Sequence, residues 1–216
     1  MANYLIDHLK RGAHVAIDEY PLLLAIRIRE AIVVNRLKQA GDHVAIHQSD
    51  FANLVNDTQS ATQAQVAADP NLSAIVGETD TEMPVIDQVL KQHGLCHQIL
   101  NLNLYDDPQN LQIIRSGCLA ADVTEPPGVY GFFAVDQLAQ MFARHLPESS
   151  LAKSIQVLEK KWGIDLVGGP STVTVTKANV PPPGKFVAPT YNYVKFFTTA
   201  WHSEFRGVAI QSSIQN

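Results

Sequence analysis

Charged side chains are scarce in this chain of 216 residues. Asp, Glu, Lys and Arg make up 17% of the sequence, against about 25% in a typical globular domain. The net charge is −5, and the only adjacent basic pairs are Lys10-Arg11 and Lys160-Lys161. A nucleic-acid-binding surface normally shows clustered basic residues, so the composition argues against a dedicated surface of that kind.

Long apolar runs are also absent. No stretch approaches the roughly 18 apolar residues that a membrane-spanning helix needs. Residues 1–8 lack the basic start and the apolar core of a signal peptide. We therefore expect cytoplasmic synthesis without export and no membrane partner.

The chain has only two cysteines, Cys96 and Cys118. They are too few and too far apart for a CxxC redox pair or a four-cysteine zinc cluster. Both lie next to a leucine, Leu95 or Leu119. The sequence therefore predicts two reduced thiols that pack in the core as small apolar side chains.

Nucleotide-binding and esterase motifs are missing as well, since the chain contains no GxGxxG, no GxxxxGK[ST] and no GxSxG. Residues 15–18, Val-Ala-Ile-Asp, resemble the opening of the isochorismatase-like hydrolases. Under that resemblance, the family's Asp, Lys and Cys would correspond to Asp18, Lys91 and Cys118. The residues around Lys91 and Cys118 depart from the family's pattern, so we assign no family.

A short phrase does recur along the chain. Residues 12–18, Gly-Ala-His-Val-Ala-Ile-Asp, are echoed by residues 41–47, Gly-Asp-His-Val-Ala-Ile-His. The Ala-Ile pair falls at 16–17, 45–46 and 74–75, so both steps are 29 residues. Because one strand with its loop and helix has about that length, the repeat predicts successive strand–helix units.

Strand and helix patterns alternate over the first two thirds of the chain. Strands are predicted at residues 13–17, 43–46, 73–76, 97–104 and 118–123. This order predicts an α/β fold whose mostly parallel sheet, flanked by helices, occupies about 13–146. The helix at 22–39 is apolar at most positions of its first half, so we expect it to be buried on most sides.

The composition changes near residue 147, which suggests a core domain at 1–147 and a C-terminal segment at 148–216. Residues 171–176 alternate hydroxyl and apolar side chains, as in a half-buried strand. The prolines at 181–183 predict a stiff spacer, and aromatic residues crowd 191–201. We expect this segment to be a helix followed by antiparallel β structure or an extended arm.

Acidic residues follow each predicted strand. In an open parallel sheet, ligands bind outside the carboxyl ends of the strands, so these positions are the first candidates for a site. The residues are Asp18, Glu19, His47, Asp50, Glu78, Asp80, Asp106, Asp107, Asp122 and Glu125.

Two interpretations of these acids remain open. Strand ends are also helix beginnings, where Asp, Ser and Thr cap backbone N–H groups and acids favour the helix dipole. Alternatively, Asp18, Glu78 and Asp80 hold Mg²⁺ or Mn²⁺ through hard oxygen ligands. Catalytic groups would then be Asp18, His47, Asp50 and Asp122, with the metal activating water.

The first functional hypothesis is a subunit of a larger shell, tube or connector. Aromatic side chains supply much of the energy of protein interfaces, and the C-terminal arm would place five of them against other subunits in a homo-oligomer. They are Tyr191, Tyr193, Phe196, Phe197 and Trp201. The alternative is a metal-dependent α/β hydrolase that uses the acids, so whether the protein is an enzyme stays open.

Overall fold

The computed structural model describes residues 1–22, 24–124, 127–144, 173–187 and 192–204. The chain divides into two compact units, which we describe separately. The first comprises Met1–Thr124 and Thr174–Val187, and the second comprises Glu125–Val173 and Ala188–Asn216. The boundary expected near residue 147 lies outside the described residues, whereas these units divide after Thr124. Within the described part, no helix has the length and apolarity to cross a membrane.

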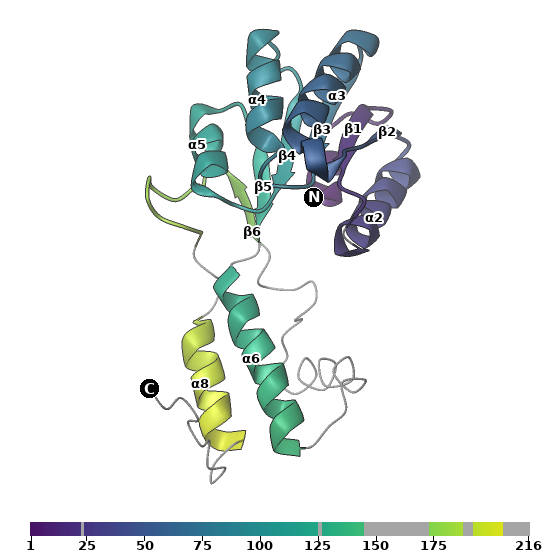
Figure 1. The fold of residues 1–216 in the computed structure, drawn as a ribbon. Coiled ribbons are helices and arrows are strands. Elements are labelled where there is room, and N and C mark those ends of the chain that lie inside the picture. Colours follow the sequence, from purple (N-terminus) through teal and green to yellow (C-terminus); the bar gives the residue numbers. More distant parts are fainter. Residues whose placement is uncertain (23, 125–126, 145–172, 188–191, 205–216) are drawn as a thin grey trace. The chain divides into compact units, whose positions relative to one another are not determined.

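A six-stranded sheet forms the centre of the first unit (Figure 1). Its order is β2-β1-β3-β4-β5-β6, and β1 to β5 are parallel. The predicted α/β class with a mostly parallel, helix-flanked sheet is therefore confirmed. The strands are β1 (His14–Glu19), β2 (His43–Gln48), β3 (Leu72–Gly77), β4 (Leu100–Leu104), β5 (Ala121–Thr124) and β6 (Val173–Thr176).

The recurring phrase corresponds to paired strands. Ala16 lies opposite Ala45 in the β1–β2 pair, so the two copies are in register. In the β1–β3 pair Ala16 lies opposite Ile75, because the register shifts by one between His14 and Val15. The 29-residue step thus reflects one strand–helix unit, as expected.

Helices cover both faces of this sheet. Helices α1 and α2 lie on one face, and α3, α4 and α5 lie side by side on the other. The chain moves in one direction across the sheet from β1 to β2 and in the other direction from β2 to β3, β4 and β5. Because crossovers between parallel strands are right-handed, α2 lies on the other face of the sheet from α3, α4 and α5. The helices are α1 (Ala2–His8), α2 (Leu24–Ala40), α3 (Leu54–Ala68), α4 (Met83–Gln92) and α5 (Pro108–Ser116), with a 3-10 turn, η1 (Phe51–Asn53), before α3.

The two faces of the sheet differ in polarity. Ile17, Val76 and Leu102 point to α1 and α2, where they join an apolar cluster. Since side chains alternate along a strand, Asn101, Asn103 and Asp122 point to the face that α3 to α5 cover, and these three are fully buried. A sheet face with buried polar groups must supply them with partners or leave them for a ligand.

Helix α2 is less buried than its sequence predicts. Leu24, Ile28 and Ile32 are 68%, 55% and 60% exposed, while Val33 and Leu37 pack in the core. The helix lies on only one sheet face, so its outer side meets no other element among the described residues of this unit. The expectation of burial on most sides was wrong.

The C-terminal residues that the structure describes beyond 172 form one strand and one helix. β6 joins β5 as the antiparallel C-terminal strand of the sheet. The aromatic segment expected to be a β arm instead forms α8 (Tyr193–Glu204), while Tyr191 lies outside the described residues. Because Tyr193, Phe197 and Trp201 recur at every fourth position, they share one helix face.

In the second unit that face packs on α6 (Pro127–Arg144). The ring of Phe132 stacks on Trp201 with centroids 5.7 Å apart, and it also contacts Tyr193 and Phe197. The Trp201 Nε1–H donates to Asp136 at 2.8 Å. Three of the predicted interface aromatics, Tyr193, Phe197 and Trp201, therefore contact α6 of their own chain, and Phe196 packs edge-on against Phe197.

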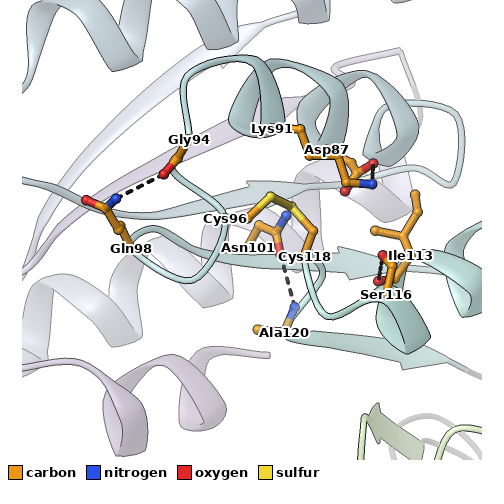
Figure 2. The surroundings of a disulfide bond; sticks show 10 residues. All are labelled: Asp87, Lys91, Gly94, Cys96, Gln98, Asn101, Ile113, Ser116, Cys118 and Ala120. Atoms are coloured by element: carbon orange, nitrogen blue, oxygen red, sulfur yellow. Dashed lines mark hydrogen bonds and ion pairs between the residues drawn. A yellow bond between two sulfur atoms is a disulfide. The ribbon is translucent and has the colours of Figure 1, made fainter.

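Cys96 and Cys118 form a disulfide (Figure 2), so the expectation of reduced thiols was wrong. Cys96 precedes β4 and Cys118 precedes β5, and these strands are neighbours. Beside the disulfide, Asn101 Oδ1 accepts a hydrogen bond from the Ala120 backbone N–H at 3.0 Å. A disulfide sulfur is not a thiolate nucleophile, which removes the role that the hydrolase resemblance implied for Cys118.

Replacing both cysteines with serine should lower the free energy of unfolding by about 3 kcal/mol, because the disulfide closes a loop between residues 22 positions apart. Urea denaturation of the two proteins measures this difference. A reductant should shift the midpoint of the wild type and leave that of the double serine variant unchanged. Equal midpoints for the oxidised wild type and the variant would contradict the stabilising role.

Candidate functional site

Acidic residues of β1, of α2 and of the loop after β3 gather at the carboxyl edge of the sheet. The strand order reverses its direction between β1 and β3, and ligands in open α/β sheets bind at such a point. All members of this first group are buried. They are Asp18 and Glu19 of β1, Glu30 of α2, and Glu78 and Glu82 between β3 and α4.

Burial raises the pKa of these carboxyl groups. The pKa of Asp18 rises to about 6, that of Glu78 to about 7, and that of Glu82 to about 8, with the charge of Asp18 adding to the effect on Glu82. Burial also raises the pKa of Glu30, and the neighbouring carboxyl of Glu19 raises it further. Near neutral pH much of this group is therefore protonated and able to donate hydrogen bonds.

Several acids do cap backbone turns, as one of the two interpretations expected. Glu82 Oε2 accepts from the backbone N–H groups of Glu78 and Thr79 at 2.8 and 2.9 Å. Asp50 caps η1 by accepting from the Ala52 N–H at 3.1 Å. Asp107 caps α5 in the same way. These side chains hold the turns at the edge in place.

A second group follows β4 and β5. Thr124 Oγ1 donates to Asp106 Oδ1. Beneath them, Asp122 is fully buried and neither of its carboxyl oxygens has a hydrogen-bond partner within the described residues. Burial, together with the charge of Asp106, raises the pKa of Asp122 to about 7. Asp122 thus lies beneath the edge as a carboxyl group that loses its proton only near neutral pH.

Tyr105, directly after β4, has an unusual backbone conformation. Its φ is +74°, in the left-handed region that non-glycine residues rarely adopt. The buried amides of Asn103 and Asn110 both donate to its carbonyl oxygen at 3.4 Å, and Asn110 also donates to the Asp80 carbonyl at 3.2 Å. Backbone strain of this kind is concentrated at functional sites.

Arg29 connects the two groups. From α2 its guanidinium donates to the Tyr105 hydroxyl at 3.2 Å and to Glu78 Oε2 at 3.4 Å. The guanidinium carbon also lies 5.3 Å from the centroid of the Tyr105 ring, within cation–π range. The ring, which is 39% exposed, is therefore held in one orientation at the edge.

The donor set suits a neutral polar ligand better than a metal ion. Protonated carboxyls, amides, a guanidinium and an aromatic ring offer donors, acceptors and one apolar surface. The predicted metal ligands Asp18, Glu78 and Asp80 do not form a ligand group. In the described part of the chain only Asp87, Cys96 and Cys118 do so, and the two sulfurs are bonded to each other.

The predicted catalytic residues are spread along the edge. Asp18 lies opposite His47 in the β1–β2 pair. Burial raises the pKa of Asp18, and His47 offsets only a small part of that effect. Gln65 Nε2 donates to Asp18 Oδ1 at 3.0 Å. Asp50 is a cap beside β2, whereas Asp122 belongs to the second group. The structure therefore brings Asp18 and His47 together but not the whole set.

Sequence reasoning missed Arg29, Tyr105, Asn103 and Asn110. Residues 101–104, Asn-Leu-Asn-Leu, did carry a signal, since strict alternation in a buried strand directs both amides to one face. Tyr105 was visible as the first residue after this strand. Arg29 gave no signal, because its position depends on how α2 is rotated on the sheet.

No model of a protein family matches this chain, and no curated protein matches it. Solved structures match in fold. GanP, a glucose-galactose binding protein from Geobacillus stearothermophilus, is 15% identical with a TM-score of 0.63, and the match covers 83% of this chain and 59% of that one. An ABC transporter periplasmic solute binding protein from Actinobacillus succinogenes, with bound D-allose, is 18% identical with a TM-score of 0.62, over 82% and 56%.

A periplasmic ribose ABC transporter from Conexibacter woesei is 17% identical, with a TM-score of 0.59 over 65% of this chain and 48% of that one. The chain thus spans about half the length of these proteins, and such identities establish the fold alone. The assembly hypothesis, its homo-oligomeric contacts and the hydrolase alternative were wrong, because the fold neighbours are described as a glucose-galactose binding protein, a solute binding protein with bound D-allose and a ribose ABC transporter.

The raised pKa of Asp122 predicts that stability falls as pH rises. Between about pH 4 and pH 7 the folded protein keeps a proton on Asp122 that the unfolded chain releases, so the free energy of unfolding decreases over this range. Asp122→Asn should reduce the decrease between pH 4 and pH 8 by on the order of 1–4 kcal/mol. Urea denaturation at both pH values measures it.

The matched control for this prediction is Asp7→Asn, at an exposed position of α1. This control should keep the wild-type pH dependence. If Asp122→Asn keeps it too, Asp122 is ionised in the folded protein and the account of a neutral group beneath the edge is incorrect.

Proposed function

We propose that the carboxyl edge of the sheet binds a monosaccharide or a similar small polyol. The observation that carries the proposal is Tyr105, held in a strained conformation by two buried amides and fixed by Arg29. Such strain costs of order 1–3 kcal/mol. A structure that keeps it at an exposed edge is consistent with positioning a side chain for a ligand.

The neighbouring groups provide the contacts that a sugar needs. Asp106, half-buried beside Tyr105, can accept hydrogen bonds from a hydroxyl pair, while its other contact, Thr124, keeps it oriented. Arg29 supplies directed donors. The Tyr105 ring offers an apolar face for the C–H groups of a sugar ring. This combination of few polar groups and one apolar surface is typical of small-molecule sites.

The fold supports the same function, because each neighbour named above is described with a sugar. One is a glucose-galactose binding protein, one is a solute binding protein with bound D-allose, and one is a ribose ABC transporter. Well-formed pockets bury most of a ligand's surface, whereas an open edge buries less. We therefore expect a Kd on the order of millimolar for the isolated chain.

The Cys96–Cys118 disulfide supports the proposal that the protein acts in an oxidising compartment. Disulfides persist in such compartments and are rare in the cytoplasm. This proposal takes the place of the cytoplasmic expectation. Thiol trapping of the protein as it is isolated tests it, and two free thiols would contradict it.

Isothermal titration calorimetry with D-glucose, D-galactose, D-ribose, D-arabinose and D-allose tests sugar binding. At least one sugar should give a saturable heat. Asp106→Asn and Arg29→Gln should each lower the affinity about tenfold, the effect of losing one hydrogen bond to a charged group. Lys38→Gln, an exposed position in the last turn of α2, next to the amino end of β2, is the matched control and should bind as the wild type does. No heat with any sugar would refute the proposal.

Tyr105→Gly separates binding from stability. Glycine adopts a φ of +74° without strain, and the relief of about 1 kcal/mol is offset by its larger backbone entropy in the unfolded state. The free energy of unfolding should therefore change little, while sugar affinity falls about tenfold or more with the loss of the ring. Unchanged affinity in this variant would exclude Tyr105 from the site.

A further inference from the structure

The opposite edge of the sheet contains a cavity of about 910 Å³. Its wall is formed by the residues that precede or begin β1, β3, β4 and β5, together with the end of α1 and the turn after β6. The volume lies within the range of small-molecule sites. Six basic side chains line the cavity: His8, Lys10, Arg11, His14, His97 and Lys177.

Among the residues that the structure describes, no Asp or Glu lines this cavity. This distribution is uneven, because the whole chain carries 21 acidic and 16 basic residues and a net charge of −5. A concave surface lined by one sign of charge concentrates counter-ions. The cavity is therefore a positive region on a negative protein, and it faces away from the acids at the carboxyl edge.

Of the six basic side chains, His14 alone has an acidic partner within the described part of the chain. The ion pairs there are His14–Asp69, Arg29–Glu78 and Lys91–Asp87. His14 is thus already engaged, because its Nδ1 lies 2.6 Å from Asp69 Oδ2. Lys10, Arg11 and Lys177 are exposed and free to contact a ligand.

The loops that carry these cations are held in place. Asp42 Oδ1 accepts from the backbone N–H groups of Gly12 and Ala13, both at 3.1 Å, which anchors the loop after Arg11. On the other side, the His97 ring and the Lys177 ammonium both lie over Gly117. A Cβ at Gly117 would be 3.2 Å from His97 Cε1 and 3.6 Å from Lys177 Nζ.

The disulfide joins two parts of this wall. Figure 2 shows Cys96 bonded to Cys118, with Gln98 and Ala120 on the same two loops. Gln98, Cys118 and Ala120 all line the cavity. The disulfide therefore fixes the spacing of the loops that carry His97 and Gly117. Preorganised cationic groups lose less conformational entropy when an anion binds.

We propose that this cavity binds a small multivalent oxyanion, a molecule that carries two or more phosphate or carboxylate groups. Ammonium and guanidinium groups bind both kinds of oxyanion through charge-assisted hydrogen bonds. The described part of the wall has no Phe, Tyr or Trp, so it offers no large ring on which a nucleotide base would stack. The site is independent of the sugar site, because it uses other residues at the other edge.

Calorimetric titration of the oxidised full chain with tripolyphosphate and with citrate tests the proposal at about 50 mM salt, where charges are weakly screened. Saturable binding of tripolyphosphate identifies phosphate as the ligand group, and binding of citrate identifies carboxylate. Lys10→Gln and Lys177→Gln should each weaken binding about tenfold. Lys195→Gln, an exposed lysine of α8 in the second unit, removes the same charge and should leave the affinity unchanged.

Far-UV circular dichroism and the thermal midpoint of each variant check that the fold is kept. We expect no change, because all three lysines are exposed. The proposal is overturned if neither anion gives heat. It is also overturned if Lys195→Gln weakens binding as much as the two cavity variants do, since the anion would then respond only to net charge.

Discussion

The hydrogen-bonded pairing of β1 with a strand on each of its sides decides which residues meet at the two ends of the parallel strands. β1 pairs with β2 on one side and with β3 on the other, and all three are parallel. This pairing brings Asp18 next to Gly77 at the carboxyl edge and His14 next to Leu72 at the amino edge. The register of β1 with its two neighbours therefore sets which residues meet at each of the two edges.

The two edges carry opposite chemistry. The carboxyl edge buries acids whose pKa values are raised, and it keeps Tyr105 in a strained conformation. The amino edge exposes cations that have no acidic partners among the described residues. Buried carboxyls and backbone strain lower stability, and proteins retain such features chiefly at functional sites. The buried polar face of the sheet beneath α4 and α5 contacts the loops of the carboxyl edge. The disulfide joins two loops of the amino edge.

Much of the fold could be predicted from sequence because the strand–helix repeat and the acids after each strand are local signals. The β1–β2 register follows the repeat directly. The disulfide could not be predicted, since strand order decides that the loops before β4 and β5 are neighbours. Arg29 depends on the rotation of α2. In α8 the four-residue period of Tyr193, Phe197 and Trp201 was present but was outweighed by the β preference of aromatic residues.

An NMR titration of the ¹⁵N-labelled chain with the sugar that gives the largest heat locates the sugar site on the sheet. Binding at the carboxyl edge should shift the amide signals of Thr79, Tyr105 and Asp106 with saturation and leave those of Gly12, His97 and Gly117 in place. Shifts confined to the amino edge, or no saturable shift in either region, would contradict it.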